Sequence, residues 1–174
     1  AGDLGRVVSI YGTYLASPVA PLSNATKKPE GMGDVEFQTR YWQNFEWLNG
    51  SPLVEQCIHI VDKVAWTMND EAPIAAIANG GRAHREDQSN IYDHYDVTYE
   101  YAGGVYAHVK QRQMMNTHGE NIHRVICENG TAVGPWNVFT LDKEGKKNWR
   151  FRKEKGKENN MYQVCHNELS LIHI

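Results

Sequence analysis

The stretch SPLVEQCIHIVDKVAWTM, residues 51–68, predicts a long helix around which the rest of the chain is organised. Ser51 is a favourable N-cap and Pro52 a favourable first helical residue. Apolar side chains recur at helical spacing and fill one broad stripe, which is typical of a helix that packs on a core. The stripe consists of Leu53, Val54, Cys57, Ile58, Val61, Val64, Ala65 and Met68.

A second, polar ridge runs along the same predicted helix. Glu55, His59, Asp62 and Trp66 lie four, three and four residues apart, so they stack on one separate face. A carboxylate beside an imidazole raises the imidazole pKa and fixes its tautomer, which suits a residue that transfers a proton. The competing interpretation is that these residues form only the solvated edge of an amphipathic helix.

Length and composition indicate one soluble globular domain. The chain has 174 residues, of which 41% are hydrophobic and 22% charged. A net charge of −3 indicates no large basic patch, and no apolar run is long enough to span a bilayer, so neither nucleic acid nor a membrane is an expected partner. The three cysteines lack zinc-type spacing, so we expect reduced thiols, a cytoplasmic location and no metal site.

Both ends of the sequence suggest a piece of a longer open reading frame. The chain begins AGDLGR, without Met, and residues 169–174 read LSLIHI, which is also the translation of a common transposon-end sequencing adapter. The expectation is one α+β domain over residues 1–168, for substrate binding and oligomerisation, followed by a possible non-native tail at residues 169–174.

The order of predicted elements defines the fold class. A strand is followed by a long loop over residues 16–33, the helix, and a run of strands, which favours α+β architecture with an open, mostly antiparallel, meander-like sheet. Strands are expected at residues 5–15, 73–78, 92–101, 105–115, 124–128, 131–133, 138–142 and 148–152, with an Asn129-Gly130 turn and a final helix over 161–169. No G-x-G-x-x-G, Walker loop or βαβ alternation occurs, so the Rossmann domain is expected to be absent from this chain, as are cofactor-binding residues.

An aromatic segment, DVEFQTRYWQNFEWLNG at residues 34–50, leads directly into the helix. Arg40, Trp42 and Trp47 lie in it, and an arginine among aromatic rings next to a polar ridge predicts substrate-binding residues. The alternative is a segment that caps the core, with Arg40 in a structural ion pair.

Several stretches together resemble the C-terminal domain of the Gfo/Idh/MocA oxidoreductases, the glucose–fructose oxidoreductase and inositol dehydrogenase family. They are GRVVSIYGTYL (5–15), RYWQNFEWLNG (40–50), EQCIHIVDKVAW (55–66), ANGGRAHREDQSNIYDHYDVTYEYAGG (78–104) and MYQVCHNEL (161–169). The helix motif, acid-x-x-x-His-x-x-Asp, is matched by Glu55, His59 and Asp62. Many inositol dehydrogenases have Asp where this chain has Glu55, so the pattern of substrate hydroxyls is expected to differ.

The resemblance implies a cofactor, a site and an assembly. NAD or NADP would be bound mainly by a Rossmann domain missing from this chain. His59 would be the catalytic residue that takes the hydroxyl proton, and Glu55 and Asp62 would bind hydroxyls of a polyol substrate. The protein would form a homo-oligomer through the sheet face.

The leading hypothesis is therefore the C-terminal substrate domain of an NAD(P)-dependent oxidoreductase acting on a sugar, cyclitol or related polyol. This fragment is expected to be inactive without its N-terminal dinucleotide-binding domain. One alternative is an NAD-dependent glycosidase of the same family. An alternative of another class is a non-catalytic assembly or carbohydrate-binding module.

Overall fold

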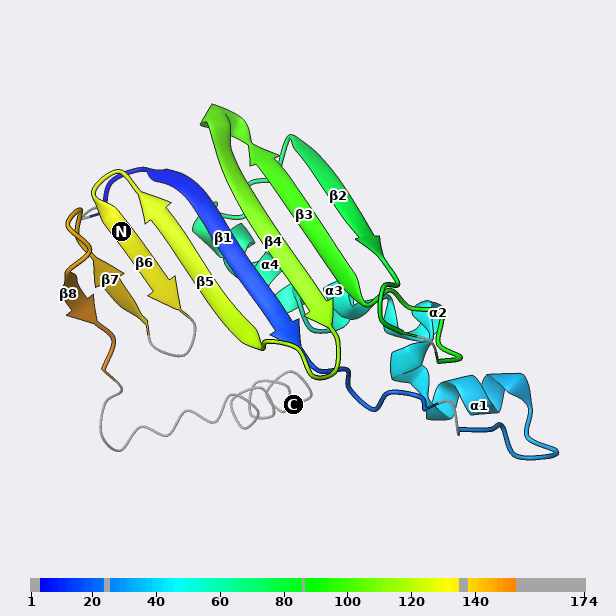
Figure 1. The fold of residues 1–174 in the computed structure, drawn as a ribbon. Helices are drawn as coiled ribbons and strands as arrows, with labels where there is room; N and C mark the ends of the chain where they lie inside the picture. Colours follow the sequence, from blue (N-terminus) through cyan, green and yellow to red (C-terminus); the bar gives the residue numbers. More distant parts are fainter. Residues whose placement is uncertain (1–3, 24–25, 86, 135–137, 153–174) are drawn as a thin grey trace, which may run out of the picture.

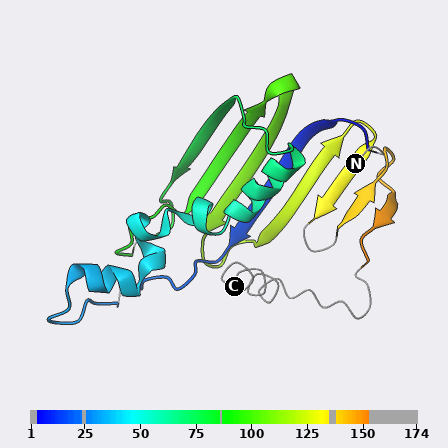
Figure 2. The same cartoon turned by 180° about the vertical axis from the view of Figure 1, so that it is seen from behind.

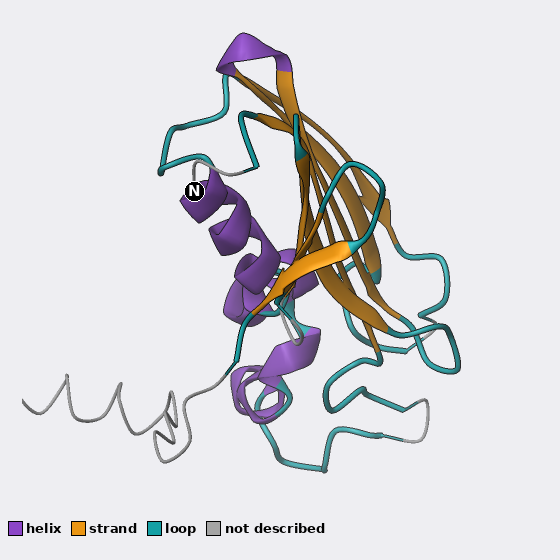
Figure 3. Cartoon of the chain, turned by 90° about the vertical axis from the view of Figure 1, so that its left-hand side faces the viewer, coloured by secondary structure: helices purple, strands orange, loops and turns teal. Residues whose placement is uncertain are grey.

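The computed structural model describes residues 4–23, 26–85, 87–134 and 138–152, and it forms an open eight-stranded sheet with helices on one face (Figures 1 and 3). All neighbouring strands are antiparallel except β1 and β4. The α+β class with an open, mostly antiparallel sheet is thus confirmed. The strands are β1 Val7–Ala16, β2 Ala75–Gly81, β3 His94–Tyr101, β4 Val105–Gln113, β5 Glu120–Cys127, β6 Gly130–Gly134, β7 Phe139–Leu141 and β8 Lys147–Arg150.

The first strand does not lie at the edge of the meander but in its middle. The strand order is β2-β3-β4-β1-β5-β6-β7-β8, so β1 separates two groups of sequential strands. Ile10 of β1 pairs with Ala107 of the parallel β4 and with Val125 of the antiparallel β5. The chain therefore leaves the centre of the sheet after β1 and returns at the edge as β2, with every helix before β2 in the crossover.

The predicted helix over residues 51–68 is broken into α3, Pro52–Glu55, and α4, Ile58–Thr67. The backbone N–H of Cys57 donates to the carbonyl of Pro52 in a wide turn, and the Gln113 side chain donates to Gln56 Oε1 at 2.8 Å. This tertiary hydrogen bond is available only in the folded protein, which explains why periodicity alone predicts a continuous helix. The other helices are α1 Asp34–Arg40, η1 Trp42–Asn44, α2 Glu46–Asn49 and η2 Ala102–Gly104.

Ser51 does not act as the expected N-cap. Its backbone lies at φ 116 and ψ 159, a region that side-chain-bearing residues rarely adopt, and its side chain makes no cap hydrogen bond. Its hydroxyl is instead hydrogen-bonded to Tyr95 of β3. The residue therefore fixes the start of α3 against the sheet.

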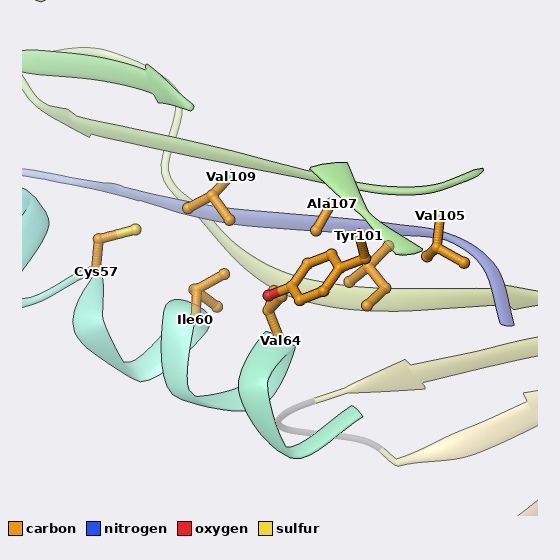
Figure 4. Packing of buried hydrophobic residues seen from close by; sticks show 8 residues of the cluster. Cys57, Ile60, Val64, Tyr101, Val105, Ala107 and Val109 are labelled. Carbon is orange, nitrogen blue, oxygen red and sulfur yellow. The ribbon is translucent and has the colours of Figure 1, made fainter. Parts of the chain in front are cut away.

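The main core lies between α4 and the centre of the sheet (Figure 4). Gly12 of β1 permits the close approach, because a Cβ atom there would lie 2.2 Å from Cγ2 of Ile60. Burial of these side chains, at about 25 cal/mol per Å² of apolar surface, holds α4 on the sheet. The buried members are Ile10, Cys57, Ile60, Val64, Tyr101, Val105, Ala107 and Val109.

A second, smaller core lies beyond the end of the sheet, where Figures 1 and 2 both place α1. Leu22, Phe37 and Phe45 form its buried centre. The amide of Asn44 is fully buried, donates to the Ala20 carbonyl and accepts from the N–H of Leu22, so it ties the loop after β1 to η1.

The β5–β6 hairpin is present, but its turn lies one residue earlier than expected. Cys127 pairs with Gly130, so Glu128 and Asn129 form the turn. Gly130 is therefore the first residue of β6. A side chain is excluded at this position, because a Cβ atom would lie 2.1 Å from the Leu141 carbonyl oxygen.

The predicted helix over 161–169 and the tail at 169–174 lie outside the described residues. In the described part of the chain, no helix has the length and apolar character needed to cross a membrane.

Candidate active site

The face of the sheet that α4 covers changes from apolar to polar at Tyr14. Gly12 faces Ile60, so Tyr14, two residues further along β1, lies on the same face. Tyr14 pairs with Gln111 of β4 and with Asn121 of β5. The neighbouring row on this face consists of Val109, Gly12 and His123, so the polar character of the Tyr14 row extends to His123 on β5.

Glu55, Tyr14 and His59 form one cluster at this row. The ring centroids of Tyr14 and His59 are 6.4 Å apart. Burial raises the pKa of Glu55 and the charge of His59 opposes that rise, while burial and then the Glu55 charge raise the pKa of Tyr14. The break between the helices therefore leaves the predicted carboxylate–imidazole pair close enough to interact.

The three ridge residues on α4 itself lie on the solvent side of this helix. His59 and Asp62 are exposed, and 66% of Trp66 is exposed. Lys63 donates from Nζ to the His59 carbonyl at 2.7 Å, and the Asp62 charge partly offsets the lowering of the Lys63 pKa by burial. The structure thus places Glu55 at the sheet surface and Asp62 one turn or more further along, in solvent.

The aromatic segment does not join this cluster through any hydrogen bond or ion pair among the described residues. Arg40 pairs with Glu36 at 2.8 Å on the exposed side of α1. Trp42 and Trp47 are 40% and 58% exposed, and the Trp47 indole donates to Gln38. These side chains belong to elements at the end of the sheet, whereas α4 crosses its middle (Figure 2).

Sequence reasoning missed the polar residues of β4 and β5. Several of their atoms are shielded from solvent and have no hydrogen-bond partner in the described residues: both amide atoms of Gln111, Oδ1 of Asn121 and Nε2 of His123, together with Oε2 of Glu55. Burial and then the Lys63 charge lower the pKa of His123 to about 4, so its ring is neutral at neutral pH. Buried polar atoms without partners are costly, and a molecule that reaches this row can form hydrogen bonds with them. Strand alternation was the only signal for them, and it does not distinguish the two faces.

A buried carboxylate fixes the loop before β3. Asp93 is fully buried, accepts backbone N–H groups from Ala83, His84 and Arg85, and lies 2.7 Å from His94 Nδ1. Burial alone would raise its pKa, but these hydrogen bonds lower it to about 2. The Asp93 carbonyl also accepts from the N–H of Gln113, so the loop positions the glutamine that holds Gln56.

The start of α1 does not fit the binding of the pyrophosphate of a dinucleotide. The glycines at positions 31 and 33 precede α1, but the first turn of α1 holds Asp34 and Glu36, whose charges would repel a pyrophosphate. No step of the chemistry is therefore assigned to a cofactor bound by these residues.

Comparisons with known proteins give a family and a fold. The family model for the GFO/IDH/MocA C-terminal domain matches residues 1–133. None of the curated proteins matches the chain. Among solved structures, UDP-N-acetylglucosamine 3-dehydrogenase GnnA from Acidithiobacillus ferrooxidans has a TM-score of 0.62 at 12% identity, over 97% of this chain and 45% of its own.

Two further structures share the fold. The WlbA dehydrogenase from Bordetella pertussis, in complex with NADH and UDP-GlcNAcA, has a TM-score of 0.58 at 14% identity, over 97% of this chain and 45% of its own. Levoglucosan dehydrogenase, in complex with NADH, has a TM-score of 0.59 at 17% identity, over 86% of this chain and 39% of its own. The chain spans less than half the length of each of the three structures. Because the family model matches well over half of the sequence, this chain belongs to the GFO/IDH/MocA C-terminal domain family.

Proposed function

We propose that this chain is the substrate domain of an oxidoreductase that uses NAD or NADP to oxidise a sugar, cyclitol or related polyol. The observation that carries the proposal is the cluster of Glu55, His59 and Tyr14 on a row of buried polar atoms without partners. The shared fold with two sugar-nucleotide enzymes and levoglucosan dehydrogenase supports the substrate class.

His59 is the proposed catalytic residue. It is exposed beside Glu55, so its imidazole can accept the proton of the hydroxyl that is oxidised. The carboxylate of Glu55 accepts hydrogen bonds from neighbouring substrate hydroxyls and so holds the substrate ring in place. Asp62 binds a more distant hydroxyl.

Arg40, Trp42 and Trp47 are assigned to the outer wall of the substrate site. Support comes from their position in the segment that runs into α3 and from the exposure of all three side chains. The Arg40–Glu36 pair lies at the surface, and exposed pairs of this kind contribute little stability, so a substrate group can replace Glu36 at little cost.

The cofactor is proposed to be held mainly by a dinucleotide-binding domain outside this chain. The acidic first turn of α1 supports this assignment, as do the NADH complexes of the relatives. The nicotinamide would supply the hydride acceptor, and the isolated fragment would be inactive. A cytoplasmic location belongs to the same proposal, supported by the free thiols of Cys57 and Cys127.

The substitution His59→Ala in the intact enzyme tests the proposal. Turnover of sugars and cyclitols, followed by the absorbance of reduced nicotinamide with NAD and with NADP, should fall by roughly two to four powers of ten, because a positioned proton acceptor contributes about that much. His118→Ala is the matched control, since His118 is exposed in the loop after β4. Unchanged turnover in the His59 variant would remove this residue from the mechanism.

A further inference from the structure

A cavity of about 390 Å³ opens beside α4, between this helix and strands β5 and β6. Its walls are mostly apolar, with Ala132, Val133 and Val138 on the sheet side and Trp66 on the helix. Lys63, Thr67 and His123 supply its polar groups. The cavity shares His123 with the set of buried polar atoms described above and extends from it toward the end of α4.

The cavity lies next to the proposed reaction centre along α4. Lys63 lines the cavity, and its ammonium group donates to the backbone carbonyl of His59, one helical turn earlier. His123 also lines the cavity, and it is two residues from Asn121 on the same face of β5. A molecule that places a hydroxyl at His59 can therefore extend along α4 into the cavity.

Trp66 gives the cavity an aromatic wall. Its side chain is 66% exposed, so the face of its ring is open to a molecule bound in the cavity. Flat aromatic surfaces bind the apolar faces of rings, and the Lys63 ammonium beside it can donate hydrogen bonds to oxygen substituents.

We infer that this cavity is a subsite for a ring attached to the oxidised sugar, so that the substrate is a glycoside or another ring-substituted sugar rather than a free monosaccharide. The inference rests on the proposed function and specifies its substrate class. The ring packs against Trp66, Ala132 and Val138, and its oxygen substituents face Lys63.

The test compares methyl and phenyl glycosides of glucose, galactose and N-acetylglucosamine, titrated calorimetrically into the intact enzyme. For at least one sugar, the phenyl glycoside should bind about three- to tenfold more tightly than the methyl glycoside, the range expected of an aromatic contact. Trp66→Ala should bring the ratio of the two dissociation constants, methyl to phenyl glycoside, close to one. Ala132→Leu, which fills part of the cavity, should do the same.

Trp149→Ala is the matched control, because Trp149 is 53% exposed on β8 and does not line the cavity. It should leave the ratio of the methyl and phenyl glycoside dissociation constants unchanged. A ratio near one for all three sugars in the wild-type enzyme, or a preference that persists in both cavity variants, overturns the subsite. Failure of the proposed function gives a different result, namely no formation of reduced nicotinamide from any substrate.

Discussion

Asp93 shows how one side chain can fix the surroundings of the site. Its carboxylate has no exposed surface and satisfies three consecutive backbone N–H groups of the loop before β3. Hydrogen bonds to an ionised acceptor are stronger than those between neutral groups, and a donor left without one inside the protein is destabilising. The charge of Asp93 is therefore a structural requirement of the loop that leads to Gln113.

The substitution Asp93→Asn should lower the free energy of unfolding at neutral pH by about 2–4 kcal/mol, since the amide accepts fewer of these hydrogen bonds. The folded pKa of about 2 lies below the usual 3.8, so the contribution of the carboxylate is present above pH 3.8 and is lost as pH falls toward 2. Urea unfolding of both proteins across this range measures the difference. Asp96→Asn, at an exposed pair with Lys110, should change stability by less than about 0.5 kcal/mol. An Asp93 variant as stable as wild type at neutral pH would contradict this account.

The carboxylate–imidazole pair of the site could be predicted from sequence because Glu55 and His59 are four residues apart. That spacing brings two side chains together in a helix, and it does so here despite the break after α3. Tyr14, Gln111 and Asn121 could not be predicted in the same way. They meet only because β1 lies between β4 and β5, and neither pairing is encoded by local spacing.

At the scale of elements, the close packing of α4 on β1 depends on a missing side chain. Gly12 is buried in the strand, and any Cβ atom there would overlap Ile60. The helical stripe around Ile60 was predictable from its periodicity, but the need for glycine at position 12 was not, since it depends on the depth to which the helix sits.

Gly12→Ala should therefore destabilise the domain by about 1–3 kcal/mol, the usual penalty for overpacking a core. In a chain that already carries Ile60→Ala, the substitution Gly12→Ala should cost less, because the overlap with the Ile60 side chain is gone. A double-mutant cycle should therefore give a favourable coupling between the two positions. Chemical unfolding of the four proteins measures it. Gly119→Ala is the control, because a Cβ there would lie 3.6 Å from its nearest neighbour. Strictly additive effects of the two substitutions would show that the helix and strand do not meet at this point.

At the scale of the molecule, the sheet presents one face to α4, and no helix of the described residues covers the other face (Figure 3). On this open face, a groove of about 670 Å³ crosses β5, β6 and β7 and is lined by Ile122, Ile126, Val133, Phe139 and Leu141. Apolar patches of this kind on a protein surface often mark interfaces. The face also carries polar side chains, so alternation along each strand predicted two-sided strands but not which side remains open.

We expect the intact protein to form a homo-oligomer through this open face. Ile126 is 42% exposed on β5 and lines the groove, so Ile126→Glu would place a charge in the apolar part of the interface, where an unpaired charge is strongly unfavourable. Sedimentation velocity should show a smaller species for this variant than for wild type at the same concentration. Val35→Glu is the matched control, because Val35 is 68% exposed on α1, away from the sheet, and lies outside the groove. A wild-type protein that sediments as a monomer, or an Ile126 variant that keeps the wild-type size, would show that copies of the chain do not assemble through this face.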